Sequence, residues 1–393
     1  MIPLALAPLS AEERAHEARL VALIRAEIAA AGGWLGFGRF MELALYAPGL
    51  GYYAAGAHKL GTGGDFVTAP ELSPVFGRCL ASAAAEVLGE LGGGTILELG
   101  AGSGALALDL LGELARSDAL PRHYLILEPS PELRARQQRR LMPLPAALRA
   151  RIAWLERPPE IPFNGVLLAN EVMDALPVER FRIGAAGLEA LGVVASGSSF
   201  AIAAAAASAP LQHAVAELEA DLPDRLPVGY QSEVCVVLGP WLATVTRPLA
   251  TGVAYLFDYG YPRREYYQAL RDGGTFACYH RQRRHDDPFL NIGLQDLTAS
   301  VDFTRVAAAA LAHGLEVAGY APQAHVLLAL GFEKHLERAR AEAPPERAPL
   351  LARAAARLVL PDDMGETFKC IALSRDYSRP LAAFALRDFT AVL

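Results

Sequence analysis

The sequence has few cysteines and no long apolar run, and both shortages exclude classes of protein. Its four cysteines are scattered without a Cys-x-x-Cys pair, which argues against a disulfide framework and a zinc knuckle. The nearest approach to a membrane span, residues 201–209, is weakly hydrophobic and well short of the roughly 20 residues required. The N-terminus resembles neither a secretory signal nor an Arg/Ser-rich transit peptide, so we expect a cytoplasmic protein.

The chain also carries a net negative charge, and several catalytic motifs are absent from it. The formal net charge of −7 argues against a general nucleic-acid binder and weakly favours basic partners. There is no Walker A pattern, no His-Glu-x-x-His and no Gly-x-Ser-x-Gly, because Ala101 stands two residues before Ser103. No metal site is expected: the segment HRQRRHDD has possible ligands, but its arginines favour a solvated or substrate-facing loop (His280, His285, Asp286 and Asp287).

What the sequence does contain is a glycine turn between a strand and a helix. Hydrophobic residues make up 53% of the chain and charged residues 20%, which is typical of a globular protein. Residues 95–99 form an apolar run typical of a buried strand, and residues 105–114 follow as a helix. Glycines occupy every second position between them (Gly100, Gly102 and Gly104). Such a turn presents backbone N–H groups and a helix N-terminus to a nucleotide-like ligand.

The glycine turn fits two cofactor templates. From Gly100 it reads Gly-x-Gly-x-x-Ala, the dinucleotide fingerprint; from Glu98 it reads Glu-x-Gly-x-Gly-x-Gly, the S-adenosylmethionine loop of class I methyltransferases. In the second template the backbone approaches the amino-acid half of the cofactor, and Glu98 lies near its ammonium group. Both templates expect an acid after the next strand to bind the ribose hydroxyls, and Glu128 fits that place. A purely structural glycine turn is the weaker alternative.

From residue 95 onward, segments of strand and helix character alternate. This alternation predicts βαβ crossovers, and therefore an α/β fold with a mostly parallel sheet. We expect strands at 95–99, 123–127, 151–155, 165–169, 253–257, 315–320 and 367–373, and helices at 105–114, 131–141, 304–313, 323–331, 333–342 and 346–358. Two insertions are expected, at about 177–250 (a hairpin at 188–203, a helix at about 234–247) and at a loop-rich 259–303.

The first 92 residues read as an N-terminal helical segment. Ser10 and Glu13 form a capping box for a helix that ends at Gly32. Further helices are expected at about 37–45 and 73–91.

Polar side chains follow two other expected strands at their carboxyl ends, where open α/β sheets place their ligands. The segment NEVMDALP begins at Asn170, directly after one strand, and Asp258 directly follows another. We interpret Asn170, Glu171 and Asp174 as site residues; a helix cap with solvated carboxylates is the alternative. Asp65, in a glycine-rich stretch, is a further candidate.

Seven stretches of the sequence narrow the choice of cofactor. In order they are FMELALYAPGLGYY (40–53), GDFVTAPELSPVFG (64–77), ILELGAGSGALALDLL (96–111), YLILEPSPELRARQ (124–137), NEVMDALPVERF (170–181), FDYGY (257–261) and GLQDLTASVDF (293–303). Together they resemble the MidA-like family of class I S-adenosylmethionine-dependent methyltransferases. The mitochondrial members of that family are the complex I assembly factor that acts as a protein arginine methyltransferase.

The resemblance implies a class I methyltransferase core over residues 93–393, preceded by a segment, 1–92, that contributes to the site. It implies S-adenosylmethionine as cofactor and, from the mitochondrial relatives, an arginine of an NADH dehydrogenase (complex I) subunit as methyl acceptor. The absent transit peptide points to a bacterial-type homologue. The residues expected to bind the cofactor are Glu98, Gly100, Ala101, Gly102, Gly104, Glu128, Pro129, Asn170, Asp65 and Thr68.

An arginine acceptor would need carboxylates. A guanidinium is charged in water, with a pKa above about 12, so carboxylates must orient it and receive its proton as the methyl arrives. Glu171 and Asp174 are the leading catalytic candidates, Asp258 is held in reserve, and Asn170 is expected near the methionine end of the cofactor.

Three other functions compete with this interpretation. A small-molecule methyltransferase with the same cofactor site would have a closed, apolar pocket and no groove for a peptide. A non-catalytic assembly chaperone would need neither the glycine turn nor Glu128. A nicotinamide-dependent dehydrogenase is separable by calorimetric titration with the two cofactors.

Overall fold

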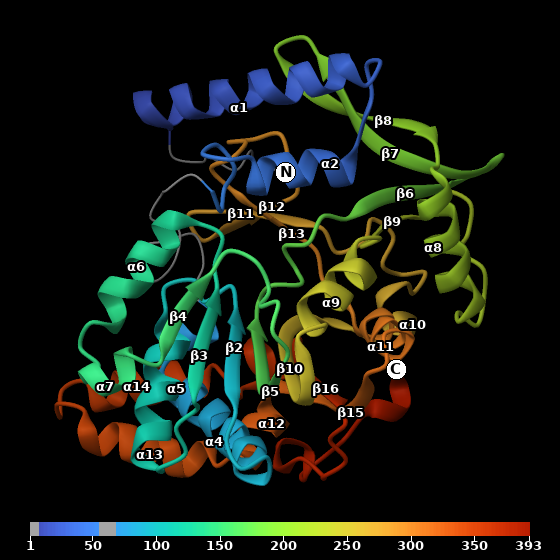
Figure 1. The fold of residues 1–393 in the computed structure, drawn as a ribbon. Coiled ribbons are helices and arrows are strands. Elements are labelled where there is room, and N and C mark those ends of the chain that lie inside the picture. The colour runs from blue at the N-terminus through green and yellow to red at the C-terminus, as the bar shows by residue number, and fades with distance from the viewer. Residues whose placement is uncertain (1–7, 55–67) are drawn as a thin grey trace. The chain divides into compact units, whose positions relative to one another are not determined.

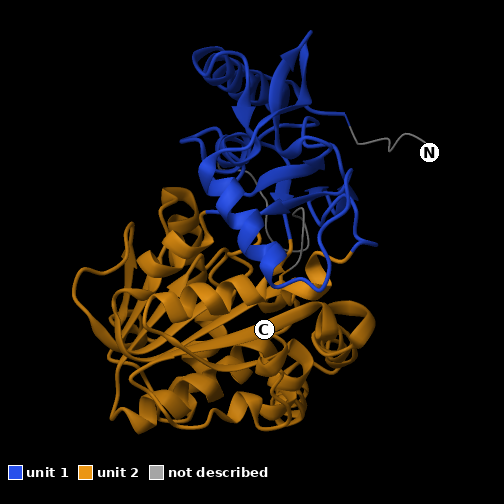
Figure 2. Ribbon diagram, turned by 90° about the vertical axis from the view of Figure 1, so that its right-hand side faces the viewer, with its two compact units in different colours: residues 1–59, 175–236, 269–299 blue, residues 60–174, 237–268, 300–393 orange. Residues whose placement is uncertain are grey.

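The chain divides into two compact units. A computed structural model describes residues 8–54 and 68–393. Unit 1 combines the described parts of 1–59, 175–236 and 269–299, and unit 2 those of 60–174, 237–268 and 300–393 (Figure 2). Residues 68–92, expected in the N-terminal segment, therefore belong to unit 2. None of the helices among the described residues is long and apolar enough to cross a membrane.

Unit 2 is built on a mainly parallel sheet (Figure 1). Its strand order is β15-β16-β10-β5-β2-β3-β4, and β14 pairs with the end of β10. The strands from β10 to β4 run parallel, whereas β16 is antiparallel to both neighbours. The predicted α/β fold with a mostly parallel sheet is confirmed. The strands are β2 Thr95–Leu99, β3 His123–Leu127, β4 Ile152–Leu155, β5 Phe163–Asn170, β10 Leu249–Tyr261, β14 Val301–Asp302, β15 Glu316–Pro322 and β16 Phe368–Arg375.

The helices of unit 2 connect these strands and cover the sheet (Figure 1). They are α3 Ala69–Leu72, α4 Pro74–Glu90, α5 Ala105–Arg116, α6 Pro131–Leu141, α7 Ala146–Arg149, α9 Leu238–Thr246, α10 Arg263–Tyr266, α11 Phe303–Ala312, α12 Gln323–Ala329, α13 Phe332–Glu342 and α14 Ala348–Ala356. Short helical turns follow at Pro361–Gly365, Ala382–Phe384 and Thr390–Val392. The predicted helices after residue 300 all form, with their ends displaced by a few residues.

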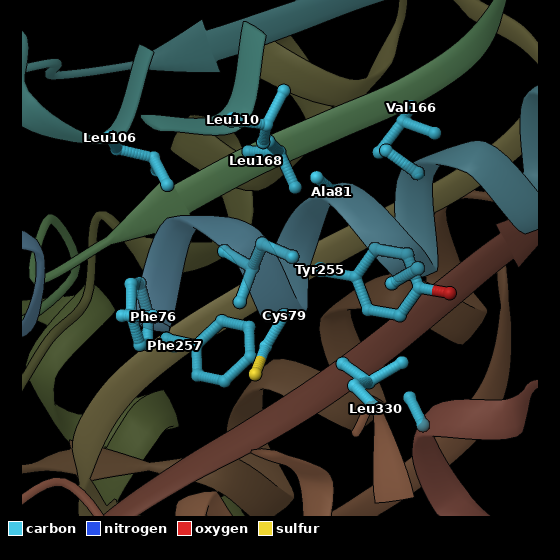
Figure 3. Packing of buried hydrophobic residues seen from close by; sticks show 14 of the residues in the cluster. Phe76, Cys79, Ala81, Leu106, Leu110, Val166, Leu168, Tyr255, Phe257 and Leu330 are labelled. Atoms are coloured by element: carbon cyan, nitrogen blue, oxygen red, sulfur yellow. The ribbon is translucent and has the colours of Figure 1, made fainter. Parts of the chain in front are cut away.

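The core of unit 2 explains why α4 belongs to it. Phe76 and Cys79 of α4 pack in one buried cluster with side chains of β5 and β10 (Figure 3). The rings of Phe76 and Phe257 meet edge to face with their centroids 5.3 Å apart. Because the apolar residues of α4 are covered by the sheet, this helix is part of the sheet's own hydrophobic core.

Unit 1 centres on an antiparallel sheet whose strands come from distant parts of the chain. Strand β7 pairs with β1, β6 and β8, and β6 pairs in turn with β9. A second sheet has the order β12-β11-β13. The strands are β1 Leu35–Gly36, β6 Glu179–Gly184, β7 Gly187–Ser196, β8 Ser199–Ala206, β9 Gln231–Val234, β11 Ala277–His280, β12 Arg283–His285 and β13 Asp296–Thr298.

The helices of unit 1 are α1 Ala11–Ala30, α2 Phe37–Tyr46 and α8 Ala209–Ala220. The predicted capping box is present at the start of α1. The Glu13 N–H donates to Ser10 Oγ at 3.1 Å, and the Ser10 N–H donates to Glu13 Oε2 at 2.7 Å. These contacts satisfy N–H groups that the first turn of a helix otherwise leaves unpaired.

Several expectations inside the insertions were wrong. The helix expected from about 234 begins only at Leu238, because residues 231–234 form β9 and pair with β6. Helix α8 was missed, and the stretch 259–303, expected to be loop-rich, also contains the short strands β11, β12 and β13 among its loops. The hairpin expected at 188–203 is confirmed as β7 and β8.

Gly252 is required by the close contact between β10 and β5. It has φ +143°, and an added Cβ would lie 1.9 Å from the carbonyl oxygen of Gly165. We expect Gly252→Ala to lower the free energy of unfolding by more than roughly 2 kcal/mol, because the strands would have to separate. The measurement is chemical unfolding followed by circular dichroism.

Gly112 offers a matched control for this prediction. It lies exposed within α5, and nothing lies within 4 Å of an added Cβ. Gly112→Ala should raise the free energy of unfolding by about 0.5–1 kcal/mol, since alanine favours the helix. Equal stability of the two variants would contradict the strand contact.

Candidate active site

The strand order of unit 2 reverses direction between β2 and β5. The chain leaves β2 towards β3 and β4 on one side, and leaves β5 towards β10 on the other. Open α/β sheets bind their ligands beyond the carboxyl ends of the strands at such a switch point. The glycine turn follows β2, and the segment beginning at Asn170 follows β5.

The glycine turn adopts a backbone conformation that its glycines permit. Gly100, Gly102 and Gly104 have φ values of +59°, +53° and +82°, a region that residues with a side chain rarely adopt. Gly104 is the N-cap of α5, and Ala101 is buried between the glycines. The Gly100 N–H donates to the carbonyl of Leu127 in β3 at 3.2 Å. The turn therefore leads directly into a helix N-terminus, which favours polar and anionic ligand groups.

A buried amide on α6 ties the glycine turn to Glu128. Gln137 Nε2 donates to the Gly102 carbonyl and to Glu128 Oε2, both at 3.0 Å. Its Oε1 accepts from Trp154 Nε1 at 3.0 Å, and Glu128 Oε1 accepts from the Ser130 N–H at 2.9 Å. Burial raises the pKa of Glu128, and the bonds from Ser130 and Gln137 oppose that rise. The carboxylate of Glu128 is thus held in one orientation beside the turn.

Glu98 is a buried acid inside β2. Its side chain is 2% exposed, and the Tyr124 hydroxyl donates to Oε2 at 2.7 Å. Burial raises the pKa of Glu98 to about 7; the charge of Glu128 adds to the rise and the bond from Tyr124 reduces it. The proximity of Glu98 to the cofactor's ammonium group stays a prediction.

Glu171 holds a strained position at the end of β5. Its φ is +53°, although it is not glycine, and its N–H donates to the Phe257 carbonyl at 2.9 Å. Such strain is typical of functional sites. Glu171 Oε1 accepts from Asn170 Nδ2 at 2.9 Å and from the Ala69 N–H at 3.2 Å. Burial and the charge of Asp174 raise the pKa of Glu171 to about 8, while the two hydrogen bonds oppose the rise.

Asp258 holds the backbone of the segment that follows Glu171. Its Oδ2 accepts from the N–H groups of Met173 at 2.9 Å and Asp174 at 3.2 Å, and its Oδ1 accepts from its neighbour Tyr259 at 3.0 Å. Asp258 is fully buried, and burial together with the charges of Asp174 and Glu171 raises its pKa well above the usual range. The structure therefore brings Glu171, Asp174 and Asp258 together, and Asp258 holds the backbone that carries Asp174.

The remaining predicted residues have different places. Asp65 lies outside the described residues. Thr68 is the N-cap of α3 and contributes its carbonyl, which accepts from the Glu71 N–H at 3.0 Å, rather than its side chain. Pro129 lies between Glu128 and Ser130, in the short connection from β3 to α6. Asn170 Oδ1 is buried and has no hydrogen-bond partner in the part of the chain that the structure describes.

Some residues near the turn were not singled out from the sequence. Gln137 lies in a strongly polar helix, where no sequence signal distinguishes it from its exposed neighbour Gln138. Arg140 and Ser103 both contact Glu71, which lies within the stretch GDFVTAPELSPVFG. Across residues 8–54 and 68–393, no cluster of three or more His, Cys, Asp or Glu is placed to hold a metal ion.

A family model of S-adenosyl-L-methionine-dependent methyltransferases, Methyltransf_28, matches residues 79–321. The chain belongs to this family. It is similar, at 40% identity, to a crystal structure from Burkholderia thailandensis that is bound to S-adenosyl-homocysteine. The TM-score is 0.92, with 99% of this chain and 100% of that chain covered. The protein is therefore an S-adenosylmethionine-dependent methyltransferase with a class I methyltransferase fold.

Two curated relatives carry a more specific name. The protein arginine methyltransferase NDUFAF7 homolog of Drosophila melanogaster is 28% identical, over 93% of this chain and 86% of the relative. The protein arginine methyltransferase NDUFAF7 of Danio rerio is 26% identical, over 86% of this chain and 83% of the relative. Both names describe mitochondrial proteins.

The residues of the site fit S-adenosylmethionine. The free acceptor on Asn170 Oδ1 suits an ammonium group, and the carboxylate of Glu128 retains lone pairs that could accept from ribose hydroxyls. The backbone of the glycine turn can be approached closely because it carries no side chains at Gly100, Gly102 and Gly104.

The buried acid Glu98 predicts a pH-dependent stability. Its pKa is about 7 in the folded protein and 4.5 ordinarily, so between these pH values the unfolded chain loses the proton more readily than the folded protein does. The free energy of unfolding therefore falls as pH rises from 4.5 to about 7. Glu98→Gln removes that cost. We expect it to raise the melting temperature, relative to the natural protein, by several degrees more at pH 8 than at pH 5.

Tyr124→Phe provides the opposite perturbation. It removes the hydrogen bond that lowers the pKa of Glu98, so the loss of stability at high pH should grow. Differential scanning calorimetry between pH 5 and 8.5 measures both effects. A pH-independent difference between Glu98→Gln and the natural protein would refute the assignment.

The hydrogen bonds of Gln137 predict an effect on the affinity for the cofactor. Gln137→Leu leaves the Gly102 carbonyl, the Trp154 N–H and one Glu128 oxygen without their partner. We expect S-adenosylhomocysteine, measured by calorimetry, to bind roughly 10- to 100-fold more weakly, as for a loss of about 1–3 kcal/mol. Gln138→Leu, on the exposed side of the same helix, should leave the affinity unchanged.

Proposed function

We propose that this methyltransferase modifies an arginine side chain of a protein. The observation that carries the proposal is the group of three carboxylates, Glu171, Asp174 and Asp258, gathered at the carboxyl ends of β5 and β10. A guanidinium is the basic side chain that needs such a group, because it keeps its charge at any physiological pH. The names of the two curated relatives support the same acceptor.

Glu171 is the group suited to receive the proton. S-adenosylmethionine, when bound, supplies an electrophilic methyl group. The ionised carboxylate of Glu171 would accept hydrogen bonds from the guanidinium, concentrate its charge on one side and take up a proton from the attacked nitrogen. Its pKa of about 8 makes it a stronger base than an ordinary glutamate.

The neighbouring acids would tune and hold Glu171. The charge of Asp174 raises the pKa of Glu171. Asp258 orients the backbone of residues 173 and 174, so it acts on the site by positioning rather than by contact with the acceptor. Asn170 would face the cofactor through Oδ1 while its Nδ2 donates to Glu171.

For the protein substrate, we propose a subunit of the respiratory NADH dehydrogenase. The family resemblance of the sequence supports this choice, since the mitochondrial members are complex I assembly factors. Mass spectrometry of methylarginine in the dehydrogenase, isolated from host cells with and without this protein, tests it. A methylarginine that depends on the protein but lies elsewhere would redirect the choice of substrate and keep the reaction.

Glu171→Gln should abolish methyl transfer and keep cofactor affinity. The amide cannot take up the proton, so we expect a loss of at least about 100-fold in turnover, with unchanged S-adenosylhomocysteine binding by calorimetry. The assay is transfer of a labelled methyl group to the acceptor found by mass spectrometry. Normal transfer by this variant would remove Glu171 from the mechanism.

The pH dependence gives a second test of the same role. Below its pKa the Glu171 carboxyl is protonated and cannot accept a proton, so kcat/KM should rise with pH and level off above about 8. Asp174→Asn removes a neighbouring negative charge that raises the pKa of Glu171. The midpoint of the profile should therefore move to lower pH in that variant.

A further inference from the structure

The four-residue helix α3 makes polar contacts at both of its ends. At its carboxyl end Glu71 contacts the glycine turn, and at its amino end Ala69 contacts Glu171. A helix this short has almost no stability of its own, because it forms too few internal hydrogen bonds. Its position must therefore come from the groups that it touches.

The contact with the glycine turn is a small polar network. Glu71 Oε1 accepts from the hydroxyl of Ser103 and from Arg140 Nη1, the latter at 2.9 Å. Arg140 Nη1 also donates to Ser103 Oγ at 3.0 Å. The side chain of Glu71 is 12% exposed and that of Arg140 is 35% exposed, so the ion pair is partly shielded from water. Removing one partner of a partly buried ion pair leaves the other charge without compensation, which costs more free energy than at an exposed pair.

The other end of α3 lies on the proposed proton acceptor. The Ala69 N–H donates to Glu171 Oε1 at 3.2 Å, and the same oxygen accepts from Asn170. Behind α3, Ser73 caps α4 by accepting from the Val75 N–H at 3.3 Å. Helix α4 packs tightly on α5, where an added Cβ at Gly77 would lie 2.7 Å from the Cβ of Asp109. Movement of α3 is therefore limited on the α4 side as well.

We propose that Glu71 is a positioning residue: by binding Ser103 and Arg140 it fixes α3, and α3 holds the Ala69 N–H on Glu171. The glycine turn that binds the cofactor and the carboxylate that receives the proton are then linked through one short helix. The inference rests on the proposed function of Glu171 only for its catalytic meaning; the contacts themselves involve no substrate.

A specific electrostatic consequence follows. The charges facing Glu171 are Asp174 on its own segment and Asp258 on β10, whose effects on it are repulsive, and the groups that stabilise its ionised form are the Ala69 N–H and Asn170. Arg140 and Asp109 lie near Glu71, and Arg78 lies near Asp109. If Glu71 no longer fixes α3, Glu171 loses one stabilising donor and its pKa rises.

The experiment titrates Glu171 directly. In infrared difference spectra, its carboxyl band is identified by its loss in Glu171→Gln. We expect Glu71→Ala to move the midpoint of this titration upward by roughly 0.5 to 1 unit and to weaken S-adenosylhomocysteine binding several-fold, while Glu71→Gln restores part of both. Glu132→Ala, an exposed acid on α6, is the matched control and should change neither.

A second variant and a separate activity measurement keep the result of this experiment interpretable. If Glu71→Ala does not fold, Ser103→Ala breaks the link from the side of the turn and should shift the same titration upward. An unchanged Glu171 midpoint in a folded Glu71→Ala or Ser103→Ala variant overturns the proposal. Failure of the proposed function is recognised separately, by normal methyl transfer in Glu171→Gln, and leaves the midpoint shift intact.

Discussion

The withdrawal of carboxylates from water at the carboxyl edge of the sheet is the constraint on which this site depends. Glu98 and Asp258 are enclosed by protein and Glu171 is partly buried, and burial is the largest cause of the rise in their pKa values. Unpaired buried acids are costly, so backbone N–H groups, a tyrosine hydroxyl and an asparagine amide are arranged around them. The strained conformation of Glu171 belongs to the same arrangement, because it brings that side chain next to Ala69 and Asn170.

The part of the site that follows from strand ends could be predicted from the sequence. Apolar runs identified β2 and β3 with their bounds. The acids that follow β5 lie close to Asp258, which falls inside the longer β10 near its carboxyl end, because neighbouring parallel strands run to one edge. The roles of Gln137 and Glu71 could not be predicted, since they depend on which helix packs beside the glycine turn. Hydrogen bonds between elements far apart in sequence leave no periodic pattern, whereas an amphipathic strand or helix does.

The same reasoning explains the errors in unit 1. Strands β1 and β9 are only a few residues long, and neither has the alternation that identifies a strand on its own. Each forms because a distant partner, β7 or β6, offers backbone groups for pairing. By contrast α1 was predicted from its capping box, which is local to Ser10 and Glu13.

The discontinuous make-up of unit 1 has a consequence for synthesis on the ribosome. Strand β1 can pair only after Val193, the partner of Leu35, has been synthesised. The unit gains its last strands only when residues 269–299 have emerged. The α1 and α2 segments thus leave the exit tunnel long before their tertiary partners exist, with apolar side chains such as Phe37 and Phe40 still uncovered. Nascent chains of this kind are natural clients of chaperones, because contacts between distant segments form slowly.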